Sequence, residues 1–443
     1  MSSANRLSFI DPARSRLFYG YVVLFIGTLG VWCSIPGQTI GVSVFTDPVM
    51  DALGLSRDQF SNAYAIGTIL SSLFISKAGR WFDRFGARYV AFAATLMLAF
   101  SVLLCSQADR MSLALQGVFD LSAATISFAL MIVLFFMIRF SGQGVLTMSS
   151  RNMIMMWFDK NRGKANAFTS VALSFGFSSA PLWLNELVEG EGWQRTWQWM
   201  AAALLFFSLV VFQLYRNRPE DHGLAVDGGS RASKEKAPEV KRPFLRLNKP
   251  FTLEEAKQTR AFWMYALLLA FHSFFITGLT FHVVSIFESS GYEKQVAISL
   301  FLPASVISVC CSTLFNFLSD YLRLKGFLFA KTGGGLVASI GLFYLDSSWG
   351  VVALTIGIGI MGGFFAVLNS VTWPRFFGRA HLGAITGKVT SFLVLGSALA
   401  PSAFAYGYSQ LGSYRYLGLL AMAYLLFILA GSIRANNPQQ SAS

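Results

Sequence analysis

The sequence predicts an all-α integral membrane protein, with twelve transmembrane helices arranged as two pseudo-symmetric six-helix bundles. Three observations predict this class: long apolar runs, an uneven distribution of basic residues, and an internal repeat. Of the 443 residues, 54% are hydrophobic and only 13% are charged, whereas a soluble globular protein carries about 25% charged residues. Apolar runs of about 18 residues or more, each long enough to cross a bilayer as a helix, recur along the chain.

The basic residues support this number of spans. With the N-terminus inside, 28 of the 35 Lys and Arg residues fall in predicted inside segments and 5 in outside segments. Because cytoplasmic loops are enriched in Lys and Arg, both termini are predicted to be cytoplasmic. The net charge of +13 follows these loops and does not indicate nucleic-acid binding. The predicted spans are residues 19–45, 60–77, 89–107, 129–150, 165–187, 197–215, 262–287, 295–316, 327–345, 350–371, 385–406 and 415–433.

The two halves of the sequence also align with each other. Their later parts match at an offset of 220 residues and their earlier parts at 237, and the difference of 17 is assigned to a long outside connection at 107–128. We expect this connection to be an amphipathic segment on the membrane surface. The polar segment 216–260 is predicted to be a flexible cytoplasmic linker, which divides the chain into domains 1–215 and 261–443. Two such repeats are typical of alternating-access carriers. The residues that match are Gly163, Gly176, Pro181, Gly192 and Arg195 with Gly383, Gly396, Pro401, Gly412 and Arg415.

A basic loop, GRWFDRFGAR (79–88), follows the second predicted span. Its two glycines allow a tight turn, and its aspartate is placed to pair with basic partners. The second half has a degenerate copy, NFLSDYLRLK (316–325). This loop resembles the signature of the major facilitator superfamily, and IRFSGQG (138–144) and GFSSAP (176–181) resemble its motifs in helices 4 and 5. The resemblance implies conformational cycling that uses Gly79, Asp83, Arg84, Gly86, Arg88, Asp320, Gly176, Pro181 and Pro401.

Further segments are similar to one branch of that superfamily, the oxalate/formate antiporters and monocarboxylate transporters. These segments are TLEEAKQTRAFW (252–263), WPRFFGRAHLGAITG (373–387) and GSALAPSAFAYGYSQLGSYRY (396–416). The first of them is expected to form a short surface helix. The branch implies a carboxylate substrate met by basic residues in spans 8 and 11. Here span 8 has no charge and span 11 has only Lys388 near its start, so the sequence departs from that pattern.

Two ionisable side chains are predicted at membrane depth. Arg139 lies about eleven residues into its span, and no Asp or Glu lies in the middle of any span to neutralise it. It either braces helix 4, through backbone carbonyls or Gln38, or contacts an anionic ligand. His272 has an equivalent depth in span 7 and is the candidate for coupling transport to protons or for a substrate hydrogen bond; the alternative is a neutral imidazole at a helix contact. Lys331 lies only a few residues into its span and is expected to extend its ammonium group to the cytoplasmic side.

Pro36 and Gly37 are expected to break the first span, because broken helices expose backbone groups where they line a cavity. The alternative is a packing kink. The predicted substrate-binding residues are Arg139, Gln38, His272, Tyr64 and Asn369.

The sequence therefore predicts a secondary transporter of a small organic anion, working by proton symport or anion exchange. A drug efflux pump and a membrane receptor that has lost transport are the alternatives. Neither a catalytic set, a metal cluster nor a phosphate loop is evident, so no enzyme activity, cofactor or metal is predicted. The expected setting is a monomer in the lipid bilayer of the cytoplasmic (inner or plasma) membrane, with a small-molecule substrate as its partner.

Overall fold

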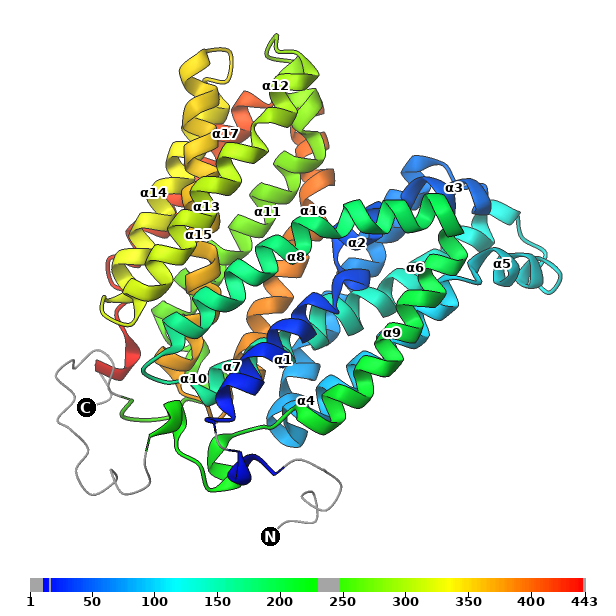
Figure 1. Ribbon diagram of the computed structural model, residues 1–443. Helices are drawn as coiled ribbons and strands as arrows, with labels where there is room; N and C mark the ends of the chain where they lie inside the picture. Colours follow the sequence, from blue (N-terminus) through cyan, green and yellow to red (C-terminus); the bar gives the residue numbers. More distant parts are fainter. Residues whose placement is uncertain (1–10, 16, 230–246, 441–443) are drawn as a thin grey trace. The chain divides into compact units, whose positions relative to one another are not determined.

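The computed structural model describes residues 11–15, 17–229 and 247–440, and the part it describes is built from helices without strands (Figure 1). Among the described residues, ten helices are long and apolar enough to cross a membrane. One of them, α4 (Arg57–Cys105), has 49 residues and contains the second and third predicted spans. The first predicted span is the shorter apolar helix α1 (Gly20–Trp32) with its continuation α2 (Thr39–Ser43). Together these helices account for the predicted apolar segments.

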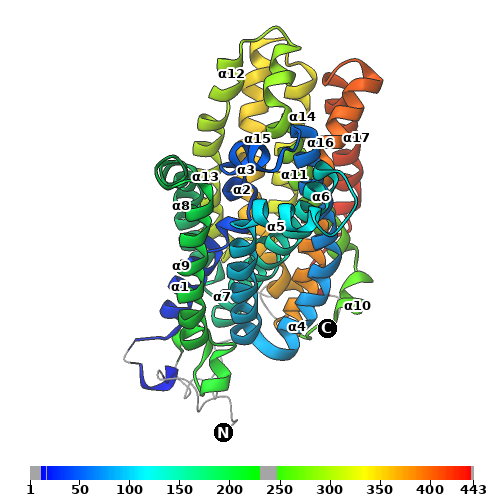
Figure 2. The same cartoon turned by 90° about the vertical axis from the view of Figure 1, so that its right-hand side faces the viewer.

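The helices form two compact units. The first unit comprises residues 1–159, 172–236 and 386–391. Within it α4 packs against α6 and α9, and α1 packs against α7, as both views in Figures 1 and 2 show. Its helices are α1, α2, α3 (Thr46–Leu53), α4, α5 (Ala108–Gln116), α6 (Ala123–Ile138), α7 (Thr147–Trp157), most of α8 (Arg162–Glu191) and α9 (Trp193–Leu214).

The second unit comprises residues 160–171, 237–385 and 392–443. In this unit α15 packs along both α13 and α14, and α14 also packs against α17. Its helices are the start of α8, α10 (Leu253–Lys257), α11 (Arg260–Glu288), α12 (Lys294–Ser299), α13 (Phe301–Ser319), α14 (Leu324–Phe343), α15 (Ser348–Phe377), most of α16 (Leu382–Leu411) and α17 (Arg415–Ser432).

Two of the short helices occur where the sequence predicts them. Helix α5 lies in the long connection at 107–128, and α10 precedes α11. Helix α10 begins with a capping box, in which the Thr252 hydroxyl accepts a hydrogen bond from the Glu255 amide and the Glu255 carboxylate accepts one from Thr252. This arrangement satisfies backbone donors at the helix start. The middle of the predicted linker, residues 230–246, lies outside the described residues.

Candidate functional site

The break predicted in the first span is present in the structure. Helix α1 ends at Trp32, a single 3-10 turn covers Ile35–Gly37, and α2 begins at Thr39. Pro36 cannot donate a backbone hydrogen bond, and Gln38 is extended, with φ −92° and ψ 153°. The Gly37 carbonyl is therefore available to a side chain, because the amide of Gly41 bonds to Gln38 instead.

The helix that carries Arg139 is itself irregular next to this break. Residues Arg139–Leu146 form a π-helical segment between α6 and α7, a distortion that is frequent at functional sites. A Cβ atom built on Gly142 would lie 2.9 Å from the Cα of Gly37, so the two backbones meet without side chains between them. This close approach brings the broken backbone of the first span within reach of Arg139.

Arg139 is buried at this junction, with 1% of its surface exposed. Its Nη1 donates to the carbonyl of Gly37 at 3.0 Å and reaches the hydroxyl of Thr39 at 3.4 Å. The guanidinium lies over the ring of Tyr64, 5.1 Å from its centroid. Its Nε and Nη2 are buried and have no hydrogen-bond partner among the described residues. The arginine is thus held by one carbonyl, one hydroxyl and one ring, while two of its three nitrogen atoms make no hydrogen bond to a described residue.

A set of uncharged polar groups surrounds the arginine. The Tyr64 hydroxyl donates to Thr39 at 2.8 Å. Gln38 does not contact Arg139 through a hydrogen bond, since its amide donates to Ser34 at 2.9 Å and to Thr147 at 3.2 Å. Nearby in the sequence, Gln143 has a buried Oε1 atom without a partner among the described residues. The cluster therefore offers donors and hydroxyl groups around a full positive charge.

This arrangement suits an anion. Placing an arginine at the centre of a membrane helix is unfavourable by at least about 2.5 kcal/mol, and Arg139 forms no ion pair with a described residue. One carbonyl and a ring compensate for part of that free energy. A planar anion that accepts from Nε and Nη2 would occupy the fork in the geometry that guanidinium groups prefer.

The second unit holds a buried lysine that was expected at the membrane surface. Lys331 in α14 is fully buried, and its Nζ donates to the carbonyl of Met361 at 2.6 Å. The expectation that it extends to the cytoplasmic surface is therefore wrong. Its ammonium lies 5.2 Å from the centroid of the Phe365 ring, and His272 stacks on the same ring at 4.4 Å. The Nδ1 atom of His272 is buried without a partner in the described part of the chain.

The remaining predicted substrate and gating residues have separate surroundings and do not form one cluster of hydrogen bonds. Asn369 is half-buried, and its side chain makes no hydrogen bond to a described residue. Gly176 packs against the indole of Trp32, which leaves no room for a side chain. Pro181 and Pro401 lie inside α8 and α16, and the carbonyl of Pro401 is 2.9 Å from Nε2 of His282.

The signature loop turns at one glycine, not two. Gly86 has φ 82° and ψ 169°, a conformation essentially restricted to glycine. Gly79 is a regular part of helix α4. It packs closely against Gly387, since a Cβ built on Gly387 would lie 2.9 Å from the Cα of Gly79. After the turn, Arg88 donates its backbone amide to Asn217 at 3.3 Å and its Nε to the carbonyl of Phe212 at 2.6 Å.

Asp83 is half-buried in the same loop, and Arg84 is exposed. Both line a small polar pocket of about 250 Å³ together with Asn217 and Asp221.

Asp320, in the degenerate copy of the loop, accepts hydrogen bonds at the start of another helix. Its carboxylate accepts from the amides of Gly163 at 2.9 Å and Lys164 at 3.3 Å, which belong to the first turn of α8. Arg375 approaches it at 3.6 Å and donates to the carbonyl of Ser319 at 2.7 Å. Burial raises the pKa of this carboxyl above its ordinary value, while the amides and the arginine act in the opposite direction. An acid at a helix N-terminus complements its free amides and dipole.

Comparison with known proteins agrees with the fold. A model of the Major Facilitator Superfamily matches residues 17–401. A protein of Thermus thermophilus named "Probable nitrate/nitrite antiporter NarK1" is 26% identical over 95% of this chain and 90% of its own length.

Two solved structures share the fold at low identity. The proton:xylose symporter XylE, bound to 6-bromo-6-deoxy-D-glucose, has a TM-score of 0.64 at 15% identity and covers 95% of this chain and 98% of its own. A bacterial homologue of the iron transporter ferroportin, in its outward-facing state, has a TM-score of 0.66 at 13% identity, with coverage of 93% and 99%. With the family model matching most of its length, the chain belongs to the major facilitator superfamily.

Proposed function

We propose that this protein is a secondary transporter of a small oxyanion, working by alternating access with proton symport or anion exchange. The observation that supports this most strongly is the buried fork of Arg139, which has two nitrogen atoms without partners among the described residues and no carboxylate to neutralise it. Buried ionisable groups in membrane spans usually mark the path of a substrate or ion.

Two lines of similarity fit the same kind of substrate. Segments of the chain resemble the oxalate/formate and monocarboxylate branch, and the relative from Thermus thermophilus is named as a probable nitrate/nitrite antiporter. Carboxylates, nitrate and nitrite share a planar group with two oxygen atoms that a guanidinium can bind in a bidentate manner. We therefore propose small planar oxyanions as the substrate class, with monocarboxylates as its organic members.

The proposal gives roles to the remaining predicted residues. Arg139 binds the anion, while Tyr64 and Gln38 hold its surroundings in place through Thr39 and Thr147. His272, together with Lys331, is the proposed proton-coupling group. We further propose that domains 1–215 and 261–443 move relative to each other in a cytoplasmic membrane, with both termini inside. In inside-out vesicles the cytoplasmic side faces the medium, so added protease should remove a C-terminal tag.

Ligand-induced thermal stabilisation of the purified protein tests the substrate class. The panel contains acetate, lactate, oxalate, formate, nitrate and nitrite, with amphipathic cations as a second group. A ligand present at about 100 times its dissociation constant stabilises the folded state by about 2.7 kcal/mol. We expect a small oxyanion to stabilise the wild type, and Arg139→Gln to remove this effect together with uptake into proteoliposomes. Arg139→Lys should restore little, because lysine lacks the planar fork.

Arg110→Gln is the matched control, since Arg110 is exposed outside the spans. It should bind and transport as the wild type does. Full uptake of the stabilising anion by Arg139→Gln would show that the arginine is only a brace. Stabilisation of both proteins by amphipathic cations alone would favour efflux, and stabilisation by an oxyanion without any uptake would favour a receptor.

A further inference from the structure

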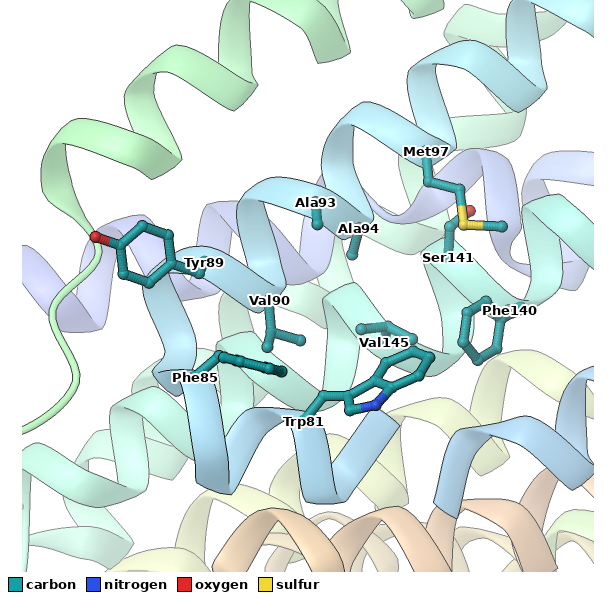
Figure 3. Close-up of a pocket in the computed structure, with 10 residues that line it drawn as sticks. All are labelled: Trp81, Phe85, Tyr89, Val90, Ala93, Ala94, Met97, Phe140, Ser141 and Val145. Atoms are coloured by element: carbon teal, nitrogen blue, oxygen red, sulfur yellow. The ribbon is translucent and has the colours of Figure 1, made fainter. Parts of the chain in front are cut away.

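An apolar groove lies on the first unit, beside the bend of α4 (Figure 3). Its volume is about 330 Å³, and all its lining residues come from α4 and the π-helical segment. The walls include the rings of Trp81, Phe85, Tyr89 and Phe140 and the side chain of Met97. The hydroxyl of Ser141 is already used, because it donates to the carbonyl of Met137 at 2.6 Å. The groove thus offers carbon and aromatic surface with little hydrogen-bonding capacity.

Local sequence explains why a groove forms here. Gly86 bends α4, so that residues before and after the bend face the same space. Small residues, Ala93 and Ala94, leave room where the larger rings stand on either side. Trp81 and Phe85 are 46% and 50% exposed in the structure. Aromatic rings exposed near the end of a membrane-spanning helix lie at the level where they contact lipid.

The position of the groove along α4 matches the depth of an acyl chain. It runs along α4 from Tyr89 to Met97, a rise of about 12 Å at 1.5 Å per residue, within a helix long and apolar enough to cross a membrane. At its other end stands the GRWFDRFGAR loop, which the charge distribution assigns to the cytoplasmic surface. The apolar part therefore lies at the depth of lipid tails, and the loop lies at the depth of headgroups.

Two arginines stand at the headgroup end. Arg80 and Arg84 are exposed and separated by one helical turn, so they lie on one face of α4. The guanidinium of Arg84 lies 5.2 Å from the centroid of the Phe85 ring, which lines the groove. Within the described ranges, no carboxylate is in salt-bridge distance of either arginine. Arg84 lines the polar pocket that also contains Asp83 and Asp221 but forms no ion pair with either, so both arginines can contact a phosphate.

We propose that this groove is a specific site for one anionic phospholipid, with an acyl chain between Trp81, Phe140 and Met97 and the headgroup phosphate on Arg80 and Arg84. The site lies next to the loop whose turn depends on Gly86. A lipid bound there contacts α4 on both sides of that turn, and lipid composition then affects the conformational cycle directly. This distinguishes a fixed lipid from the mobile lipid that surrounds any membrane protein.

Quenching of Trp81 fluorescence by brominated lipids tests the proposal. The full-length protein is reconstituted in phosphatidylcholine vesicles that contain either dibrominated phosphatidylglycerol or dibrominated phosphatidylcholine. Both brominated lipids are used over the same series of mole fractions. The signal of Trp81 is the difference between the wild type and Trp81→Phe. We expect the phosphatidylglycerol to half-quench it at a roughly thirtyfold lower mole fraction, because each of the two arginines near anionic lipid contributes about 1 kcal/mol.

Variants separate the headgroup contact from the groove. Arg80→Gln with Arg84→Gln should make the two lipids quench equally, and Ala93→Phe should fill the groove and weaken quenching by both. Leu103→Phe, on an exposed position of the same helix, is the matched control and should behave as the wild type does. Native mass spectrometry gives a second readout in which the wild type retains one more phosphatidylglycerol than Ala93→Phe. Equal quenching by both lipids in the wild type, or no quenching by either, would overturn the proposal.

Discussion

At the scale of single residues, each unit solves the problem of a buried cation in the same way. Arg139 donates to the carbonyl of Gly37 and Lys331 to the carbonyl of Met361, and each cation lies near an aromatic ring. A carbonyl carries only a partial charge, so it offsets only part of the charge of a buried cation. A positive potential that remains at Arg139 is what the proposed anion transport requires.

The sequence identified one of these cations and misplaced the other. Arg139 was recognisable because it lies in the middle of a long apolar run. Lys331 lies near a helix start, where lysine side chains usually extend to the surface. The glycines of α14 and α15 prevent that here: a Cβ built on Gly334 would lie 2.7 Å from Ile360, and the backbone of α15 therefore comes within reach of Lys331. The runs KTGGG (331–335) and GIGIMGG (357–363) are the signal that could have predicted this contact.

The carboxyl of Asp320 leads to a prediction about pH. Burial is the largest cause of its pKa shift and raises the pKa, so the folded state favours the protonated form. A group with a raised folded pKa stabilises the fold below its unfolded pKa, and this contribution is lost as the pH rises through the folded pKa. We therefore expect the melting temperature of the wild type, relative to Asp320→Asn, to decrease between acid and neutral pH.

Melting curves of both proteins over this range measure the difference. The other titrating groups are common to both proteins and cancel in the comparison. A difference that grows toward neutral pH would contradict the prediction. It would mean that the Gly163 amide and Arg375 stabilise the carboxylate more than burial destabilises it.

At the scale of elements, the bend of α4 depends on a backbone conformation that only glycine adopts easily. Gly86→Ala introduces strain of about 1–3 kcal/mol, and its Cβ would overlap the side chain of Asn217. The same substitution at Gly192 introduces the backbone strain without an overlap, so comparing the two variants separates these effects. Gly192 has φ 81° and ψ 159°, and its nearest neighbour to a new Cβ is the flexible end of Gln194 at 3.8 Å.

We expect both alanine variants to melt at lower temperature than the wild type, with Gly86→Ala the less stable. Displacing Asn217 also removes the hydrogen bond that it accepts from the amide of Arg88, so transport should fall in Gly86→Ala alone. Thermal unfolding and proteoliposome uptake measure the two effects. Equal loss of stability and of uptake in both variants would show that the Asn217 contact is unimportant.

Elements were predictable where local chemistry decides them. The break at Pro36 and Gly37 followed from the missing amide of proline, and α10 followed its capping residues. The π-helical segment Arg139–Leu146 had no such signal, because its irregularity arises where Gly142 packs against the broken backbone of another helix. The loop glycines show the same limit: Gly79 and Gly86 are the same residue type, and tertiary packing alone decides which of them turns.

At the scale of the whole molecule, transport against a gradient requires that proton movement and substrate movement be linked. In the proposed secondary transporter, the free energy for this comes from an ion or substrate gradient. If one proton accompanies each anion, a difference of one pH unit supports about a tenfold accumulation. His272 and Lys331 share the Phe365 ring and are the proposed sites where that proton is carried.

Replacing His272 or Lys331 with a neutral side chain of similar size should uncouple anion movement from proton movement without stopping anion movement. We expect Lys331→Met and His272→Gln to exchange the stabilising oxyanion across proteoliposomes at equilibrium, yet to lose accumulation driven by an imposed pH gradient. Lys325→Met, at a half-buried lysine near the start of the same helix that donates to Ile433 and Asn436, should accumulate as the wild type does. Accumulation retained in both variants would place the coupling elsewhere. A wild type that exchanges anions but shows no accumulation driven by pH would leave anion exchange as the mechanism, and the two side chains would then serve to hold α11, α14 and α15 together.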